Sequence, residues 1–134
     1  MSCYARAYDS TYHPPAAVVE ATVRAAGEQA PIVTLTALVD SGADGTMIPI
    51  DILRAVGARY VETRQMRGVT GVAYTVDLYL VTIQIGSHVV RGIRVVAQGA
   101  EPLIGRDVLN QLVITLATSR HTRAGSFMLS WMTA

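Results

Sequence analysis

Ala37-Leu38-Val39-Asp40-Ser41-Gly42-Ala43-Asp44 is the most informative stretch of this chain. It closes an apolar run that begins at Ile32, and a run of this length and composition predicts a buried strand. The run ends abruptly in a carboxylate, a small hydroxyl residue and a glycine, which together are typical of a tight turn. We therefore expect a buried strand that delivers the carboxylate of Asp40 into a turn.

The triplet Asp40-Ser41-Gly42 also suits an ordinary surface turn, because Asp and Ser bond to nearby backbone and Gly adopts positive φ. A second stretch favours a functional interpretation. It has two apolar residues and a glycine ahead of a short helix-like segment, and it reads Glu101-Pro102-Leu103-Ile104-Gly105-Arg106-Asp107-Val108-Leu109. The two stretches in this order and separation are more specific than either one alone.

Together the two stretches resemble the signatures of the retropepsin-like aspartic proteases. In that family an apolar run enters Asp-(Ser/Thr)-Gly-Ala, and two apolar residues and a glycine follow later, before a short helix. The resemblance covers roughly residues 18–129. It implies an all-β, closed β-barrel of the acid-protease type, with one or two short helices and one lobe per chain.

The pattern of the remaining chain agrees with this fold, because nearly every expected element is a strand bounded by turn residues. Strands are expected at 17–24, 31–39, 46–49, 60–68, 72–85, 89–96, 113–117 and 127–132, and short helices at 50–56 and 106–111. Residues 1–15 lack periodicity and end in two prolines, which predicts an irregular N-terminal arm. Residues 16–134 would then form the protease domain.

Composition limits the classes of partner. A chain of 134 residues is one domain. Its net charge of +1 indicates neither nucleic acid nor an anionic membrane as a partner. It is 51% hydrophobic and 16% charged, with a mean hydropathy of +0.34, which is apolar for its size. We therefore expect part of its surface to close against another subunit.

No cofactor or metal is expected. Cys3 is the only cysteine, so no intrachain disulfide can form. The three histidines, His13, His88 and His121, lack the spacing of metal ligands. The start of the chain lacks a signal-peptide pattern, and no window reaches about 18 uninterrupted apolar residues. The default expectation is therefore a cytoplasmic protein with no membrane segment in this chain.

The chain contains a single Asp-Ser-Gly motif, and this has a consequence for assembly. Peptide hydrolysis by carboxylates needs two of them at one water, one to remove its proton and one to donate to the carbonyl oxygen. Asp44 follows Asp40 too closely to face it, and Asp107 lacks the turn. One motif in a chain half the size of a two-lobed protease therefore implies a symmetric homodimer. We expect an aspartic endopeptidase that cleaves a peptide or protein substrate, works best on the acid side of neutrality, and is inactive as a monomer.

The resemblance also assigns roles to individual residues. The catalytic group would be Asp40, with Ser41 bonding across the dimer axis and Gly42 admitting the substrate backbone. Substrate would contact Ala43, Asp44, Leu103 and Ile104, and also Val69, Thr70, Gly71 and Val72 at the tip of a flap formed by the hairpin 60–85. Gly105 and Arg106 would be structural, with Arg106 pairing to Asp44. Leu103 and Ile104 would form an apolar wall of the cleft, which predicts hydrophobic substrate residues beside the cut. The final hairpin, with Phe127, Leu129 and Trp131, would supply either dimer interface or ordinary core.

Two other classes of function are considered. The first is a catalytically weak relative that dimerises and binds peptides, because an intact motif does not prove turnover and the tip Gly68–Gly71 matches the family's flap only loosely. The second is a nucleic-acid loop of the Gly-x-x-Gly type at Gly68–Gly71, beside Arg64 and Arg67. That module needs flanking helices and a basic face, whereas this stretch is strand-like and the chain is nearly neutral.

Overall fold

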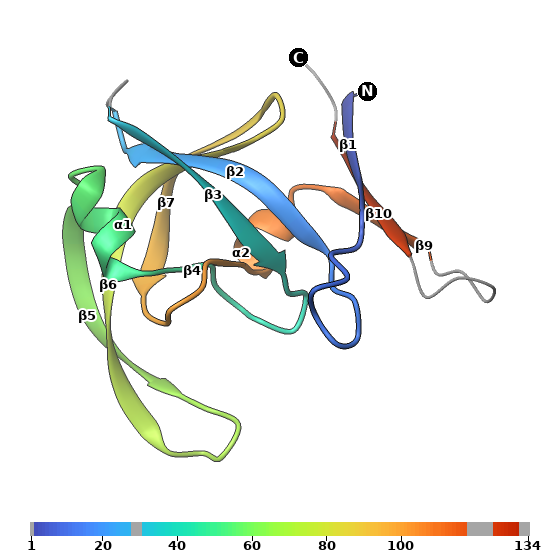
Figure 1. The fold of residues 1–134 in the computed structure, drawn as a ribbon. Coiled ribbons are helices and arrows are strands. Elements are labelled where there is room, and N and C mark those ends of the chain that lie inside the picture. Colours follow the sequence, from blue (N-terminus) through green and yellow to red (C-terminus); the bar gives the residue numbers. More distant parts are fainter. Residues whose placement is uncertain (1, 28–30, 118–124, 132–134) are drawn as a thin grey trace.

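The computed structural model describes residues 2–27, 31–117 and 125–131, which form two sheets (Figure 1). The larger sheet contains β2 (Val18–Ala25), β3 (Ile32–Val39), β4 (Met47–Ile48), β5 (Arg59–Arg67), β6 (Ala73–Ile85), β7 (His88–Ala97) and β8 (Leu103–Ile104). The smaller sheet contains β1 (Ser2–Ala7), β9 (Val113–Ala117) and β10 (Ser126–Trp131). The two short helices are α1 (Ile50–Ala55) and α2 (Arg106–Leu109).

The larger sheet closes on itself. Its strand order is β2-β3-β8-β4-β7-β6-β5, and β2 also pairs with β6, from Thr22↔Gln84 to Ala25↔Val81. This last pairing joins the two sides of the sheet into a barrel, from which β5 continues as the outer strand of a hairpin (Figure 1). The predicted all-β closed barrel with short helices is confirmed.

The barrel strands follow their hydrophobic pattern. In β2 the residues Val19, Ala21, Val23 and Ala25 alternate into the core, as the sequence periodicity predicts. Both helices add buried side chains to the same cluster, Leu53 from α1 and Val108 and Leu109 from α2. Burial of each large apolar side chain contributes about 1.5–3 kcal/mol before conformational entropy is subtracted. Among the described residues, no helix has the length and apolar character needed to cross a membrane.

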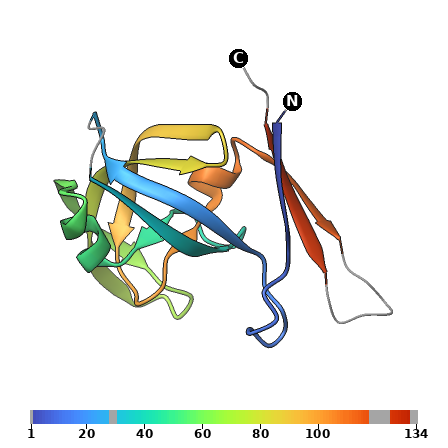
Figure 2. The same ribbon diagram turned by 45° about the horizontal axis from the view of Figure 1, so that its top comes forward.

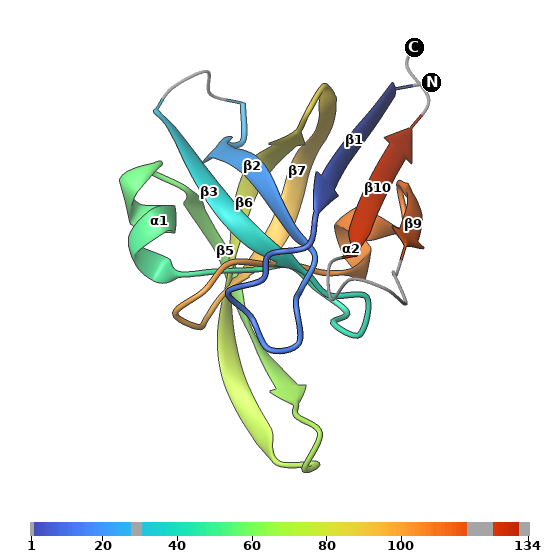
Figure 3. The ribbon, with the colours of Figure 1, turned by 45° about the vertical axis from the view of Figure 1, so that its right-hand side comes forward.

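The hairpin expected at 60–85 is confirmed as β5 and β6, and it extends away from the barrel (Figures 1 and 3). At its tip, Gly71 N–H donates to Gly68 O at 2.9 Å, and Gly68 N–H donates to Val72 O at 3.3 Å. Gly71 has φ +78°, a conformation that glycine adopts without strain. Val69 at the tip is fully exposed. An apolar side chain is therefore held in solvent at the end of the hairpin.

The segment predicted to be an irregular arm contains a regular strand. Ser2–Ala7 forms β1, which pairs antiparallel with β10 from Ser2↔Trp131 to Ala7↔Ser126. Most β1 side chains are exposed, so the strand is held by its backbone ladder and by Tyr4, whose ring centroid lies 6.2 Å from that of Phe127. Such a strand has no local periodicity to detect, which explains why the prediction for these residues is wrong. The boundary between arm and domain at residue 15 stays a prediction.

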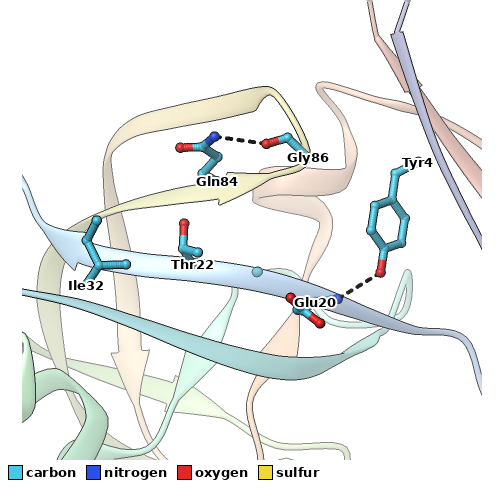
Figure 4. Close-up of a pocket in the computed structure, with 7 residues that line it drawn as sticks. Tyr4, Glu20, Thr22, Ile32, Gln84 and Gly86 are labelled. Carbon is cyan, nitrogen blue, oxygen red and sulfur yellow. Dashed lines mark hydrogen bonds between the residues drawn. The ribbon is translucent and has the colours of Figure 1, made fainter.

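The smaller sheet, which contains the first and last strands, β1 and β10, stands beside the barrel (Figure 2). Glu20 N–H of β2 donates to the Tyr4 hydroxyl at 3.2 Å, across a hollow of about 440 Å³ between the two sheets (Figure 4). The expected final hairpin is confirmed as β9 and β10, and residues 118–124 of its connection lie outside the described residues, His121 among them. The side chains of Phe127, Leu129 and Trp131 are 2%, 0% and 6% exposed in the main core. These three side chains are therefore part of the core of one chain, and a dimer interface on the final hairpin stays a prediction.

Candidate active site

The two sequence motifs lie side by side. The strand β3 runs parallel to β8, with Leu38 opposite Leu103 and Val39 opposite Ile104. One residue further, Asp40 N–H donates to Ile104 O at 2.9 Å. The catalytic candidate is therefore attached through its backbone to a residue that is 1% exposed in the core. That burial also corrects the role expected of Ile104, because its side chain faces the core and not a substrate.

The turn after β3 fixes the orientation of the Asp40 carboxyl group. Gly42 N–H donates to Asp40 Oδ1 at 2.9 Å, and Ala43 N–H donates to Asp40 O at 3.3 Å. A Cβ at position 42 would lie 3.2 Å from Asp40 Oδ1, closer than most such contacts, so glycine lets this amide approach the carboxyl group. Asp40 is half-buried, whereas Ser41 and Gly42 are exposed. The turn thus presents one carboxyl group at the surface on a rigid support.

Gly105 is required by close packing of two backbone segments. A Cβ at this position would lie 2.6 Å from both the carbonyl carbon and the carbonyl oxygen of Gly45. Immediately beyond it, Arg106 N–H donates to Ala43 O at 2.9 Å. Because Gly105 has φ −98°, the restriction is steric and not conformational. The start of α2 can therefore dock on the catalytic loop only when residue 105 lacks a side chain.

A buried polar network supports the same contact, and the sequence analysis missed it. Thr46 is fully buried, and its N–H and Oγ1–H donate to Asp107 Oδ2 and Oδ1 at 3.0 and 2.7 Å. Thr46 Oγ1 accepts from Gly105 N–H at 3.1 Å, and Asp107 Oδ1 accepts from Val108 N–H at 2.9 Å. Buried polar groups need such partners. Asp107, set aside above as a second catalytic carboxylate, instead ties α2 to the loop that carries Asp40.

The expected pairing of Asp44 with Arg106 is present, with Arg106 Nη2 donating to Asp44 Oδ1. The two side chains are 78% and 50% exposed. Exposed ion pairs contribute little to stability because water screens them. The pair therefore adds less to the support of the loop than the buried network of Thr46 and Asp107 does.

A hollow of about 350 Å³ separates the catalytic loop from the β5–β6 hairpin. Its lining includes Ala43, Asp44 and Val69, which the sequence analysis assigned to substrate binding, but not Thr70, Gly71, Val72 or Leu103. Gly42, which was expected to admit the substrate backbone, also lines the hollow, and the lining residues that the sequence did not indicate are Gly45, Met47, Met66, Arg67, Tyr74, Val96 and Gln98. Met47 and Met66 pack against a small cluster of Val76, Leu78 and Val96. The hollow thus has an apolar floor and a polar rim beside the Asp40 turn.

The described residues hold no group of three His, Cys, Asp or Glu side chains that is placed to bind a metal. The turn itself presents the carboxyl group of Asp40, the neighbouring hydroxyl group of Ser41 and the exposed residue Gly42. A single carboxyl group can take a proton from water or give one to it, but it cannot do both at once.

Comparison with solved structures identifies the class of fold. A retropepsin-like aspartic protease from Rickettsia conorii matches with a TM-score of 0.63 and 12% identity, covering 99% of this chain and 95% of that chain. The EIAV protease matches with a TM-score of 0.53 and 19% identity, covering 71% and 86%. The simian foamy virus (mac) protease matches with a TM-score of 0.51 and 23% identity, covering 70% and 92%. The fold of this chain is therefore that of the retropepsin-like aspartic proteases.

The sequence itself identifies the family. A family model described as gag-polyprotein putative aspartyl protease matches residues 31–111, which include both motifs. The chain belongs to this family. Among curated proteins, none matches the chain. The matched residues begin just before β3 and end before β9, so the smaller sheet and the barrel strand β2 lie outside the family match.

Proposed function

We propose that this protein is a homodimeric aspartic endopeptidase, in which Asp40 of each subunit contacts one shared water. The observation that carries the proposal is the support of the turn: the Asp40 backbone is bonded to Ile104 and its carboxyl group to the Gly42 amide. The barrel supplies one such turn per chain, so two copies are needed for a pair of carboxyl groups. Membership of an aspartyl protease family supports this chemistry.

The reaction uses the two carboxyl groups in different protonation states. Two carboxyl groups about 3 Å apart share one proton over a wide pH range. The ionised one removes a proton from water, whose oxygen bonds to the carbonyl carbon, while the protonated one donates to the carbonyl oxygen. Transfer of a proton to the amide nitrogen then lets the C–N bond break, which releases an acid and an amine. The exposed Ser41 and Gly42 flank this site, Ser41 towards the partner and Gly42 towards the substrate backbone.

The hollow beside the turn fits a hydrophobic side chain of the substrate. Met47, Met66 and Val96 are apolar, and the unbranched thioethers adapt to side chains of different shape. At its rim, Asp44 offers an acceptor to substrate N–H groups. The hairpin tip, with Val69, Thr70, Gly71 and Val72, would close over an extended peptide and exclude water. The expected preference is for hydrophobic residues next to the cut.

The test is cleavage of a mixed peptide library at about pH 4–7, the range in which a carboxyl pair shares a proton. We expect cuts beside hydrophobic residues that disappear in Asp40→Asn and with a transition-state-mimicking aspartic protease inhibitor. Asp51→Asn is the matched control, because Asp51 is an exposed carboxylate at the start of α1, away from the turn. Cleavage retained in Asp40→Asn would contradict the proposal.

The peptide-binding module is the alternative that this experiment separates. A folded dimer that cuts nothing in the library, but binds inhibitor or peptides at the Asp40 turn, would favour that reading. Isothermal titration calorimetry with the same inhibitor measures this binding. A protein that is dimeric and neither cuts nor binds would contradict both functions.

A further inference from the structure

We infer that the partner subunit docks on an apolar surface beside the catalytic turn, formed by Tyr8, Pro15, Ala17, Val39, Ile114 and Leu116. This docking surface rests on the proposed function, because only a dimer needs one. Its centre is a hollow of about 460 Å³ whose lining also includes Ala16 and Ser41. Val39 and Ser41 are the two neighbours of Asp40 in the chain. A second copy that brings its own Asp40 to this turn therefore has to cover the surface.

The chemistry of the lining suits a second copy of the same chain. A two-fold axis brings residues of one subunit close to the same residues of the other. Like charges near such an axis would repel each other. None of the residues that line the hollow is charged. The surface can thus face its own copy without electrostatic cost, whereas the hollow beside the flap has Asp44 and Arg67 in its lining.

The docking surface has both a hollow and a projection, as a self-complementary interface requires. Leu116 is 60% exposed on β9, a strand that pairs only with β10 among the described elements. In that ladder Leu116 lies opposite Phe127, and Ile114 lies opposite Leu129. Opposite residues in an antiparallel pair share a face, so Leu116 lies on the core side of the sheet, at the edge of the hollow. It can enter the hollow of the partner subunit.

The other face of β9 provides a control within the same strand. Val113 is also 60% exposed, but it lies on the face opposite to that of Ile114 and Leu116 and does not line the hollow. Exposure of an apolar side chain is therefore the same at the two positions, and only the face differs. If the interface is the docking surface, a charge at Leu116 should weaken the dimer and a charge at Val113 should not.

The walls of the hollow are already fixed within one subunit. Tyr8 N–H donates to Gly125 O at 2.8 Å, which joins the end of β1 to the start of β10. On the other side, Val39 N–H donates to Ala17 O at 2.9 Å. The strand β1 itself pairs along its length with β10 of its own chain. The partner thus meets a preformed surface, and little chain has to become ordered on association.

The experiment compares Leu116→Asp with Val113→Asp in the full chain by sedimentation at a series of concentrations. We expect Leu116→Asp to raise the dimer dissociation constant by at least about tenfold, because it places a charge in the apolar hollow of the partner subunit. Val113→Asp should leave it within about threefold of wild type, the range of energetically neutral positions. Equal dissociation constants for the two variants would overturn the inference. Leu116→Ser is the milder variant if Leu116→Asp fails to fold, and the same comparison then applies.

A mixture of variants provides a second readout. Leu116→Asp and Leu116→Arg should each dimerise poorly alone, and the mixture should form heterodimers and recover cleavage, because each charged side chain would then enter a hollow whose own position 116 carries the opposite charge. Failure of the mixture to recover would count against direct contact at this position. A wild-type chain that is monomeric at every concentration would overturn the homodimer of the proposed function. A wild-type dimer unaffected by Leu116→Asp would overturn only the docking surface.

Discussion

The amide of Asp40 donates to the carbonyl oxygen of Ile104, a residue from the other sequence motif. The position of the candidate catalytic carboxyl group is therefore set by a core strand and not by its own loop alone. Gly105 and Thr46 extend this support, since they let α2 and the loop pack backbone to backbone. The first predictions concern these supports.

Gly105→Ala should destabilise the fold by about 1–3 kcal/mol, because the new methyl group would overlap the Gly45 backbone. Thermal or urea unfolding measures the change. Gly45→Ala is the matched control, because its Cβ would lie at an ordinary 4.0 Å from Asp107 Oδ2. Equal stability of the two variants would contradict the close-packing explanation.

Thr46→Val should cost about 1–3 kcal/mol, the typical penalty for leaving buried partners without a hydrogen bond. The variant keeps the shape of the side chain but removes the hydroxyl group between Asp107 and Gly105. Thr36→Val on β3 is the control, since Thr36 is exposed. We expect an unfolding midpoint for Thr36→Val close to wild type, and a Thr46→Val midpoint equally close would show that the network contributes nothing.

Asp9 should titrate below its ordinary range. The side-chain hydrogen bond from Thr11 and then the backbone hydrogen bond from Thr11 lower the pKa of Asp9. Because the folded-state pKa is the lower one, this contribution is present above the unfolded pKa and is lost as pH falls through the folded value. The Asp9 turn should thus stay intact over the acidic range proposed for activity. Carboxyl NMR titration measures the pKa, and Thr11→Val should raise it towards 3.8, the ordinary value.

Tyr12 should titrate above its ordinary range, because its hydroxyl group donates to Glu101 and this bond raises the pKa of Tyr12. The contribution is present below the unfolded pKa and is lost as pH rises through the folded value. Ultraviolet difference titration of wild type against Glu101→Ala, which removes the acceptor, measures it, and the variant should titrate at lower pH. An unchanged curve would contradict the contact.

Mixing of Asp40→Asn and wild-type subunits should show whether the active site is formed between two subunits. An excess of Asp40→Asn subunits should inhibit the wild-type enzyme, because a mixed dimer has only one ionisable Asp40 carboxyl group. Dilution of the wild type below its dimer dissociation constant should lower specific activity, because the dimer that holds both carboxyl groups then dissociates. The control is Asp40→Asn combined with Leu116→Asp, which should inhibit far less. Wild-type activity that is unaffected by either treatment would contradict a site formed between subunits.

Much of the fold could be predicted because its signals are local. The alternation in β2 and the apolar run into Asp40 each report burial within a few residues. The strand β1 could not be predicted in this way, because only its pairing with β10 defines it. Similarly, the alternation of Phe127 and Leu129 indicates a buried face, but it does not tell core from interface.

The site was predicted in part for the same reason. The turn at Asp40 and the glycine at 105 belong to contiguous motifs, so sequence alone identifies them. Met47 and Met66 line one hollow only because β4 and the hairpin meet in space. The bond between Thr46 and Asp107 joins two residues that have ordinary neighbours in the sequence. No local pattern indicates that these two side chains are partners.

The opposition of Ser2 and Trp131 at the open end of the β1–β10 ladder has a mechanical consequence. A force that pulls Ser2 and Trp131 apart would act on this pair first and would then separate the ladder one pair at a time, since the strands are antiparallel. The strands of the smaller sheet would therefore separate before the force reaches the barrel. Stretching would remove the surface proposed for the partner before it disturbed the strand that carries Asp40.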